Sequence, residues 1–272
     1  MIDINAAKAE LLTQGYSDDN VEGKIAQDIL LKAIEQSGMK PNVTIKGGVV
    51  MANLTNDVRR ATMDLDVDLM RYPISDEGIE AMVSRMNCIE GVSITRIGDI
   101  IELRQQNYRG KRIYLSLRDE RGVAIQTKID IGVHVKEEVA QSEYPFDVRM
   151  ISEDDALLFA NSPEQVFVEK LKSLLRLGPI SSRAKDVYDM AYLCDLVRRE
   201  EMLHMIDVFI YQDERMRERS IADIVRRMRR TFEDRDCRAR LSHPRANWLR
   251  MDVDAALRKQ LSFVEGLEIE NT

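Results

Sequence analysis

The chain has 272 residues, of which 44% are hydrophobic and 32% charged, a composition that predicts a folded protein and excludes a disordered one. Its net charge of −7 disfavours a nucleic-acid partner for the chain as a whole, and its three scattered cysteines disfavour a disulfide framework or a zinc site and suit a reducing cytoplasm. The opening residues lack a basic start and an apolar run, and no apolar stretch reaches membrane-spanning length, so we expect neither a secretory signal nor a membrane span.

Residues 1–150 predict alternating helices and strands. The expected helices cover residues 18–37, 48–57 and 75–86, and the expected strands cover residues 42–45, 63–69, 92–97, 100–104, 112–117 and 123–131. The later strands are separated by short turns, which indicates antiparallel pairing within a mixed sheet. We therefore expect an α/β (α+β) domain in which helices pack against that sheet.

Residues 151–272 predict helices alone. Ser162 can cap a helix whose first residue is Pro163 and which ends before Gly178. A second helix is expected over residues 182–199, and Ser220 can cap a third that has one apolar stripe. This half of the chain is therefore predicted to be an all-helical C-terminal domain.

Three alternating aspartates are the clearest chemical signal in the chain. If residues 62–68 form a strand, Asp64, Asp66 and Asp68 share one face and their carboxylates repel one another. A hard divalent cation would relieve that repulsion, and Mg²⁺ is usually held by one or two carboxylates together with phosphate oxygens. A solvated face on an edge strand is the alternative, although strands disfavour aspartate.

Two other pieces fit phosphate chemistry. Gly47 and Gly48 come between a predicted strand and a predicted helix, where backbone N–H groups can approach a phosphate, although a lone glycine pair is more typical of an ordinary turn. Lys128 and Asp130 share one face of a later strand and could supply a phosphate contact and a third carboxylate. An exposed lysine–aspartate pair is the alternative.

The helical half offers two weaker signals. Asp186 and Asp189 lie on one side of a predicted helix, and spacing alone favours helix capping as their role. Residues 215–250 hold 12 arginines and 5 acids. This segment could grip an RNA backbone, or it could form a salt-bridged solvent face, which the interspersed acids favour.

Five pieces occur in the order seen in one known family. They are Lys46-Gly47-Gly48, residues 60–66, Lys128-Ile129-Asp130, Glu169-Lys170 and residues 183–189. Over these pieces the chain resembles the AbiEii/AbiGii-type nucleotidyltransferase toxins of type IV toxin–antitoxin and abortive-infection systems, in the DNA polymerase β-like superfamily. The resemblance implies a mixed-sheet nucleotidyltransferase domain over residues 1–150 and a helical C-terminal domain over residues 151–272.

The resemblance also implies roles for individual residues. The implied catalytic residues are Asp64, Asp66, Asp130 and Asp186, of which Asp64, Asp66 and Asp130 would hold Mg²⁺. The implied nucleotide-binding residues are Gly47, Gly48, Thr62, Lys128 and Lys170. Asp186 matches a position that activates the acceptor hydroxyl or assists nucleotide binding, and Asp68 is expected behind the metal ligands rather than among them.

The activity implied by the resemblance is transfer of a nucleoside monophosphate from an NTP to an acceptor hydroxyl. The expected acceptor is the 3′ end of tRNA, gripped by the Arg-rich segment 215–250, and the expected protein partner is a separately encoded antitoxin. Two alternatives stay open: nucleotidyl transfer to a small molecule, and a nucleotide- or RNA-binding regulator without turnover.

Overall fold

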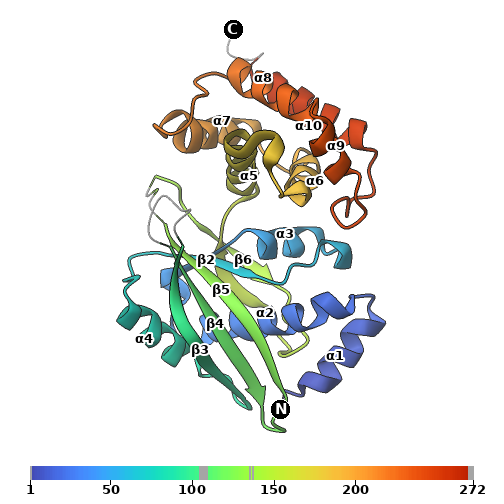
Figure 1. Ribbon diagram of the computed structural model, residues 1–272. Helices are drawn as coiled ribbons and strands as arrows, with labels where there is room; N and C mark the ends of the chain where they lie inside the picture. Colours follow the sequence, from blue (N-terminus) through green and yellow to red (C-terminus); the bar gives the residue numbers. More distant parts are fainter. Residues whose placement is uncertain (1, 104–109, 135, 137, 269–272) are drawn as a thin grey trace. The chain divides into compact units, whose positions relative to one another are not determined.

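The computed structural model describes residues 2–103, 110–134, 136 and 138–268, and Figure 1 shows their elements. The chain divides into two compact units, Met1–Asn161 and Ser162–Thr272, and each is described by itself. The fold class is as predicted: the first unit combines a mixed sheet with helices, and the described part of the second unit is helical.

Within the described residues of the first unit, seven strands form one mixed sheet in the order β3-β4-β5-β2-β1-β7-β6. The strands are β1 Val43–Lys46, β2 Leu65–Leu69, β3 Val92–Leu103, β4 Gly110–Asp119, β5 Ala124–Val133, β6 Ser142–Phe146 and β7 Ala156–Ala160. Strand β2 is parallel to β5 and antiparallel to β1, while β1 is parallel to β7. The short strands β1 and β2 are thus central, and the residues that they carry are held from both sides.

The helices of the first unit are α1 Ile4–Thr13, α2 Asp18–Gln36, α3 Gly48–Thr55 and α4 Asp76–Met86, with short 3-10 turns at Lys40–Asn42 and Val58–Arg60. Helix α2 runs across the sheet (Figure 1) and contacts β5 and β7. Its apolar side chains Ile25, Ile29 and Leu30 are fully buried. Because hydrophobic burial dominates folding energetics, this contact anchors the helix rigidly against the strands that carry the candidate site.

The strands depart from the predicted pattern in two places. The separate strands expected over residues 92–97 and 100–104 are one strand, β3, whose register with β4 shifts between Ile97 and Ile101; residue 104 itself lies outside the described residues. A positive φ at Gly98 accompanies the shift. Strands β6 and β7 were not predicted, and the expectation of helices alone after residue 150 is wrong at β7, which precedes the second unit.

The second unit contains α5 Pro163–Leu177, α6 Ala184–Leu193, α7 Arg199–Ile206, α8 Ile221–Phe232, α9 Arg235–Leu241 and α10 Val253–Gly266, with a 3-10 turn at Gly178–Ile180 and a π-helical turn at Asp207–Tyr211. Ser162 caps α5 by accepting from Gln165 N–H, and Ser220 caps α8 by accepting from Asp223 N–H, as predicted. The single helix expected over residues 182–199 ends at Leu193. In the described part of the chain, no helix has both the length and the apolarity needed to cross a bilayer.

Candidate functional site

The glycine pair lies where β1 passes into α3. Gly47 caps the helix with φ 67° and ψ −133°, a conformation that favours glycine. A Cβ atom at Gly47 would lie 2.5 Å from Oδ2 of Asp66, and one at Gly48 would lie 2.7 Å from Oγ1 of Thr62. The first N–H groups of α3 have no acceptor within the helix and can donate to phosphate oxygens. The structure therefore brings Gly47, Gly48, Thr62 and Asp66 together beside a set of backbone donors.

Helix α2 fixes the segment that leads into β2. Gly23 packs against this segment so closely that a Cβ there would lie 2.9 Å from Cα of Met63. Gln27, which is 4% exposed, donates from Nε2 to the carbonyl oxygen of Thr62 at 2.7 Å and to that of Asp64 at 3.5 Å. The backbone that carries Thr62 and Asp64 is therefore held by a buried side chain rather than by strand pairing.

The acidic residues do not all occupy the strand predicted for them. Strand β2 begins at Leu65, so Asp64 precedes the strand, and its Oδ2 pairs with Nζ of Lys128 at 3.1 Å. Asp66 lies within β2 and is in direct register with Asp130 on the parallel strand β5. Strand β5 thus brings Lys128 to Asp64 and Asp130 to Asp66.

Asp130 has a partner that was not predicted. Arg112 lies opposite it across the β4–β5 ladder and donates from Nε and Nη2 to its two oxygens at 2.6 and 2.7 Å. These paired hydrogen bonds raise the pKa of Arg112. Because each Asp130 oxygen accepts only one hydrogen bond from the guanidinium, a metal ion at Asp130 would share the carboxylate with Arg112.

Asp68 forms a separate buried ion pair. Its Oδ1 accepts from Nζ of Lys46 at 2.5 Å, and the Asp68 residue is 5% exposed. A Cβ on the facing Gly132 would collide with the Asp68 carboxylate. Asp68 therefore lies behind Asp66, where a lysine compensates its charge.

The residues present fit Mg²⁺ as a two-carboxylate site. Asp64 and Asp66 would supply two oxygen ligands, and the missing side chain of Gly47 leaves space beside Asp66 that a Cβ would fill. Among the described residues, no group of three or more His, Cys, Asp or Glu side chains is arranged to hold a metal ion. A site with phosphate oxygens as the remaining ligands needs only the two carboxylates, and the predicted third ligand, Asp130, would be shared with Arg112.

In the second unit, Lys170 lies between two aspartates. Its Nζ is 2.6 Å from Oδ1 of Asp186 and 2.8 Å from Oδ2 of Asp189. Asp189 is fully buried and also accepts from the indole N–H of Trp248 at 2.9 Å. Asp186 lies in the first turn of α6, where the predicted capping of the helix dipole would place an acid, and both acids also bind Lys170. The structure thus unites Lys170 and Asp186, both implied by the resemblance, and adds Asp189 and Trp248.

The Arg-rich segment 215–250 makes many contacts within its own unit. Arg226 pairs with Asp223, Arg229 with Glu265, and Arg238 with Asp254. Arg227 and Arg240 donate to the backbone oxygens of Leu175 and Pro179. These contacts match the salt-bridged face, and a phosphate backbone would have to compete with them.

Four residues that organise the two clusters were missed by sequence reasoning: Gln27, Arg112, Lys46 and Trp248. Arg112 was within a predicted strand, but only the register of β4 with β5 places it opposite Asp130. Gln27 is a polar residue on a buried helix, and nothing in its spacing marks its acceptor. Trp248 is the one tryptophan of the chain, which is the only signal that could have drawn attention to it.

Comparison with known proteins gives one family. The model of the family described as "Nucleotidyl transferase AbiEii toxin, Type IV TA system" matches residues 29–262. A search of curated proteins gives no match. Among solved structures, the chain is similar to an antigenic nucleotidyltransferase-like protein from Paracoccidioides brasiliensis, with 16% identity and a TM-score of 0.42, covering 67% of this chain and 78% of that one. A likeness at this level assigns neither a fold nor an activity.

Proposed function

The chain belongs to the AbiEii nucleotidyltransferase toxin family of type IV toxin–antitoxin systems, and from this membership and the site geometry we propose that it transfers a nucleoside monophosphate from an NTP to the 3′-terminal hydroxyl of tRNA. The observation that carries the proposal is the close approach of Gly47 to Asp66 and of Gly48 to Thr62. It places the backbone donors of a helix N-terminus beside the carboxylates that would hold the triphosphate's metal ion.

The triphosphate would bind to three kinds of group. The N–H groups at the start of α3 and the hydroxyl of Thr62 donate to phosphate oxygens. Lys128, whose Nζ lies 3.1 Å from Asp64, supplies a positive charge that can move from the carboxylate to a phosphate. Asp64 and Asp66 would hold Mg²⁺, which when bound would neutralise charge on the attacking and leaving oxygens.

The reaction follows from this placement. The acceptor hydroxyl oxygen forms a bond to the α-phosphorus, and the bond from that phosphorus to the bridging oxygen breaks. Pyrophosphate leaves, and the hydroxyl proton passes to solvent water. Holding both reactants in line for this displacement supplies much of the acceleration.

Lys170 and Asp186 are proposed to act as a unit. Lys170 is 9% exposed and contacts two aspartates, so its charge is shared between them. Asp189 pairs with the lysine and is fully buried, and Trp248 donates a hydrogen bond to Asp189. We propose that Asp189 is the permanent partner of Lys170 and Asp186 the exchangeable one, so that the lysine can pass from Asp186 to a phosphate oxygen.

The direct test uses α-labelled nucleotides. The purified chain is incubated with total tRNA, Mg²⁺ and each α-labelled NTP separately, and label in RNA is measured after gel separation. We expect transfer by the wild type and a loss of at least about 100-fold in Asp64→Ala/Asp66→Ala. The matched control is Glu153→Ala/Asp154→Ala, which removes two exposed acids outside the site.

The outcomes separate the parts of the proposal. Label in RNA with the wild type and the control, but not with the site variant, supports the reaction and the acceptor. Label that appears only in small molecules keeps the reaction and overturns the tRNA acceptor. Absence of label with every nucleotide overturns the enzymatic proposal.

The family also leads us to propose an antitoxin as a partner and abortive infection as a biological setting. Expression of the wild type should then arrest growth, because modified tRNA ends cannot be charged. Expression of Asp64→Ala/Asp66→Ala should not arrest growth. Arrest by both proteins would mean that toxicity does not come from nucleotidyl transfer.

A further inference from the structure

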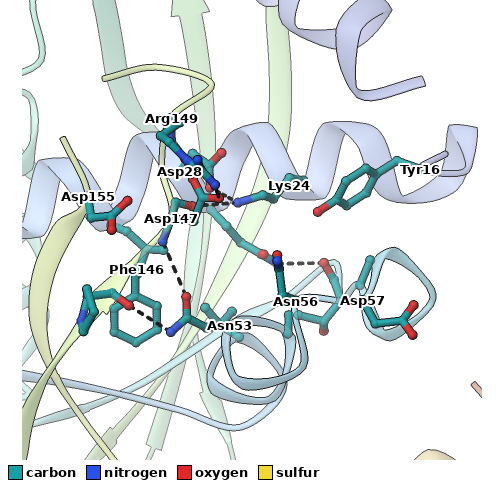
Figure 2. Close-up of a pocket in the computed structure, with 17 residues that line it drawn as sticks. Tyr16, Lys24, Asp28, Asn53, Asn56, Asp57, Phe146, Asp147, Arg149 and Asp155 are labelled. Carbon is teal, nitrogen blue, oxygen red and sulfur yellow. Dashed lines mark hydrogen bonds and ion pairs between the residues drawn. The ribbon is translucent and has the colours of Figure 1, made fainter. Parts of the chain in front are cut away.

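A cavity of about 380 Å³ lies in the first unit, between α2, α3 and the chain that follows β6 (Figure 2). This volume is in the range of small-molecule sites. The cavity shares Thr62 with the candidate nucleotide site, but Gly47, Gly48, Asp64 and Asp66 are not in its lining. The cavity therefore adjoins the candidate nucleotide site at Thr62, and its charged lining residues have no role in the proposed nucleotidyl transfer.

The inner wall of the cavity contains a buried carboxylate. Asp28 on α2 is 0% exposed, and its Oδ1 accepts from Nζ of Lys24 at 2.6 Å. Lys24 also donates to the carbonyl oxygen of Asp147 at 2.9 Å. The other Asp28 oxygen, Oδ2, is buried and has no hydrogen-bond partner among the described residues. A buried carboxylate oxygen without a donor is costly.

The charge of Asp28 is only partly compensated. Burial raises its pKa to about 7, although the neighbouring Lys24 lowers it. A second positive group at Oδ2 would offset the remaining desolvation cost. This is the chemical requirement that the inner wall sets for a ligand.

The described lining of the cavity, Asp28 included, carries more negative than positive groups. It contains four carboxylates, from Asp28, Asp57, Asp147 and Asp155, and two cations, from Lys24 and Arg149. Arg149 already pairs with both oxygens of Asp147, and Asp57 pairs with Arg59 outside the cavity. Asp155 is exposed at the surface. An anion would be repelled by this lining, and a cation would be attracted.

Apolar side chains complete the wall. Leu31 from α2, Val49 from α3 and Phe146 from β6 line the same cavity as the carboxylates. A ligand that matches this lining has an alkyl body and ammonium ends. The amide of Asn53, which donates to the carbonyl oxygen of Pro145 at 2.9 Å, braces α3 against β6 and holds the cavity open (Figure 2).

We propose that this cavity binds a small alkyl diamine or polyamine, with one ammonium group donating to Asp28 Oδ2 and a second facing Asp155. The first contact is a charge-assisted hydrogen bond inside the protein and supplies most of the affinity. The second is near solvent and is screened, so it contributes less.

The test is calorimetric titration at pH 8 with 1,4-diaminobutane and with spermidine, and 1,4-butanediol is the uncharged control of the same length. We expect saturable one-to-one binding of the amines and no binding of the diol. Asp28→Asn keeps the shape but removes the charge, and we expect it to weaken binding at least about tenfold. Asp155→Asn should weaken binding about two- to fivefold.

Asp154→Asn is the matched control for Asp155, because it removes an adjacent exposed charge that does not line the cavity. It should leave binding unchanged. Equal weakening by both surface variants would reduce the effect to general attraction between a cation and an acidic protein, and would overturn the site. Failure of the wild type to bind either amine, or binding of inorganic phosphate in the cavity, would overturn it as well.

If Asp28→Asn does not fold, Asp155→Asn and Asp154→Asn still decide the question. In that case amide chemical shifts of the wild type are followed during titration with 1,4-diaminobutane. Changes confined to Asp28, Asp147, Asp155 and their neighbours support the site. Changes spread over the acidic surface contradict it.

Discussion

Replacing Gly47 by alanine tests whether the backbone approach to Asp66 builds the nucleotide site. The new Cβ would lie 2.5 Å from Asp66 Oδ2, where ordinary contact begins at 3.4 Å. The φ of 67° and ψ of −133° at Gly47 lie in a region nearly exclusive to glycine, which costs another residue about 1–3 kcal/mol. Strand β2 is paired on both sides, to β1 and β5. The Asp66 backbone therefore cannot retreat, and its carboxylate must rotate away.

The two effects appear in different assays. We expect urea denaturation to show a loss of about 1–3 kcal/mol in the free energy of unfolding, which comes from the backbone conformation. We expect nucleotidyl transfer to fall at least about 100-fold under conditions where the variant is folded, because both the carboxylate and the N–H donors are displaced.

Substitutions at two other glycines distinguish the effect of backbone strain from the effect of the new Cβ contact. Gly38 also has a positive φ, of 74°, but a Cβ there would meet nothing within 4 Å. Gly38→Ala should therefore lose about 1–2 kcal/mol of stability and keep its transfer rate. At Gly48 the φ is not positive, and a Cβ would press on the Thr62 hydroxyl at 2.7 Å. Because that side chain can rotate, Gly48→Ala should lose about tenfold in rate, as expected for one displaced phosphate contact.

The reasoning fails if Gly47→Ala keeps the wild-type rate of transfer. It also fails if Gly38→Ala loses as much rate as Gly47→Ala, because the loss would then follow from strain anywhere in the unit. The stability measurements distinguish these results from unfolding.

Three further predictions concern buried and half-buried polar pairs. Arg112→Ala should lower the free energy of unfolding by about 1–3 kcal/mol, because Asp130 loses both of its paired hydrogen bonds, and Arg112→Lys should restore less than half of it in urea denaturation. Trp248→Phe should cost about 1–3 kcal/mol by the same measurement, because Asp189 is fully buried and loses a donor. Asp28→Asn should become more stable relative to the wild type as pH rises from 4 to 8, by up to about 4 kcal/mol. The reason is that burial raises the pKa of Asp28 from 3.8 to about 7, so the folded wild type ionises a buried side chain in that pH range.

The sign of the Asp28 prediction follows from proton counting. Between pH 4 and 7 the folded wild type holds a proton on Asp28 that the unfolded chain has released, so the wild type loses stability as pH rises. An asparagine does not titrate and removes this dependence. A wild type and Asp28→Asn whose stabilities change in parallel between pH 4 and 8 would show that Asp28 has an ordinary pKa in the folded state.

Local patterns in the sequence were sufficient to predict most of the elements that build the site. The caps Ser162 and Ser220, the glycine pair and the apolar stripes depend on neighbours within four residues, and each is observed close to the predicted place. Strand β6 was missed because it contains Pro145, which strands disfavour. Strand β7 was missed because it is only five residues long, Ala156–Ala160, and follows an irregular segment. Their pairing with each other and with β1 is long-range information that propensity does not contain.

The partners of the charged residues could not be predicted from the sequence, because they lie far apart in it. Lys128 and Asp130 were predicted to share a face, but the partner of Lys128 is Asp64, on a different segment. Arg112 reaches Asp130 through strand register. Lys170 reaches Asp186 and Asp189 through the packing of α5 on α6. Charged pairs of this kind require the fold before they can be assigned.

The three alternating aspartates show why spacing alone could not assign their roles. Asp64 precedes the strand, Asp66 faces the glycine turn, and Asp68 binds Lys46. Asp66 and Asp68 lie on one face of β2, but they have different neighbours on β5. Asp66 is in register with Asp130, and Asp68 is in register with Gly132. A glycine there admits the Lys46–Asp68 pair, whereas an aspartate would have extended the acidic cluster. The residue on the neighbouring strand therefore decides whether the aspartate beside it pairs with Lys46 or joins the acidic cluster.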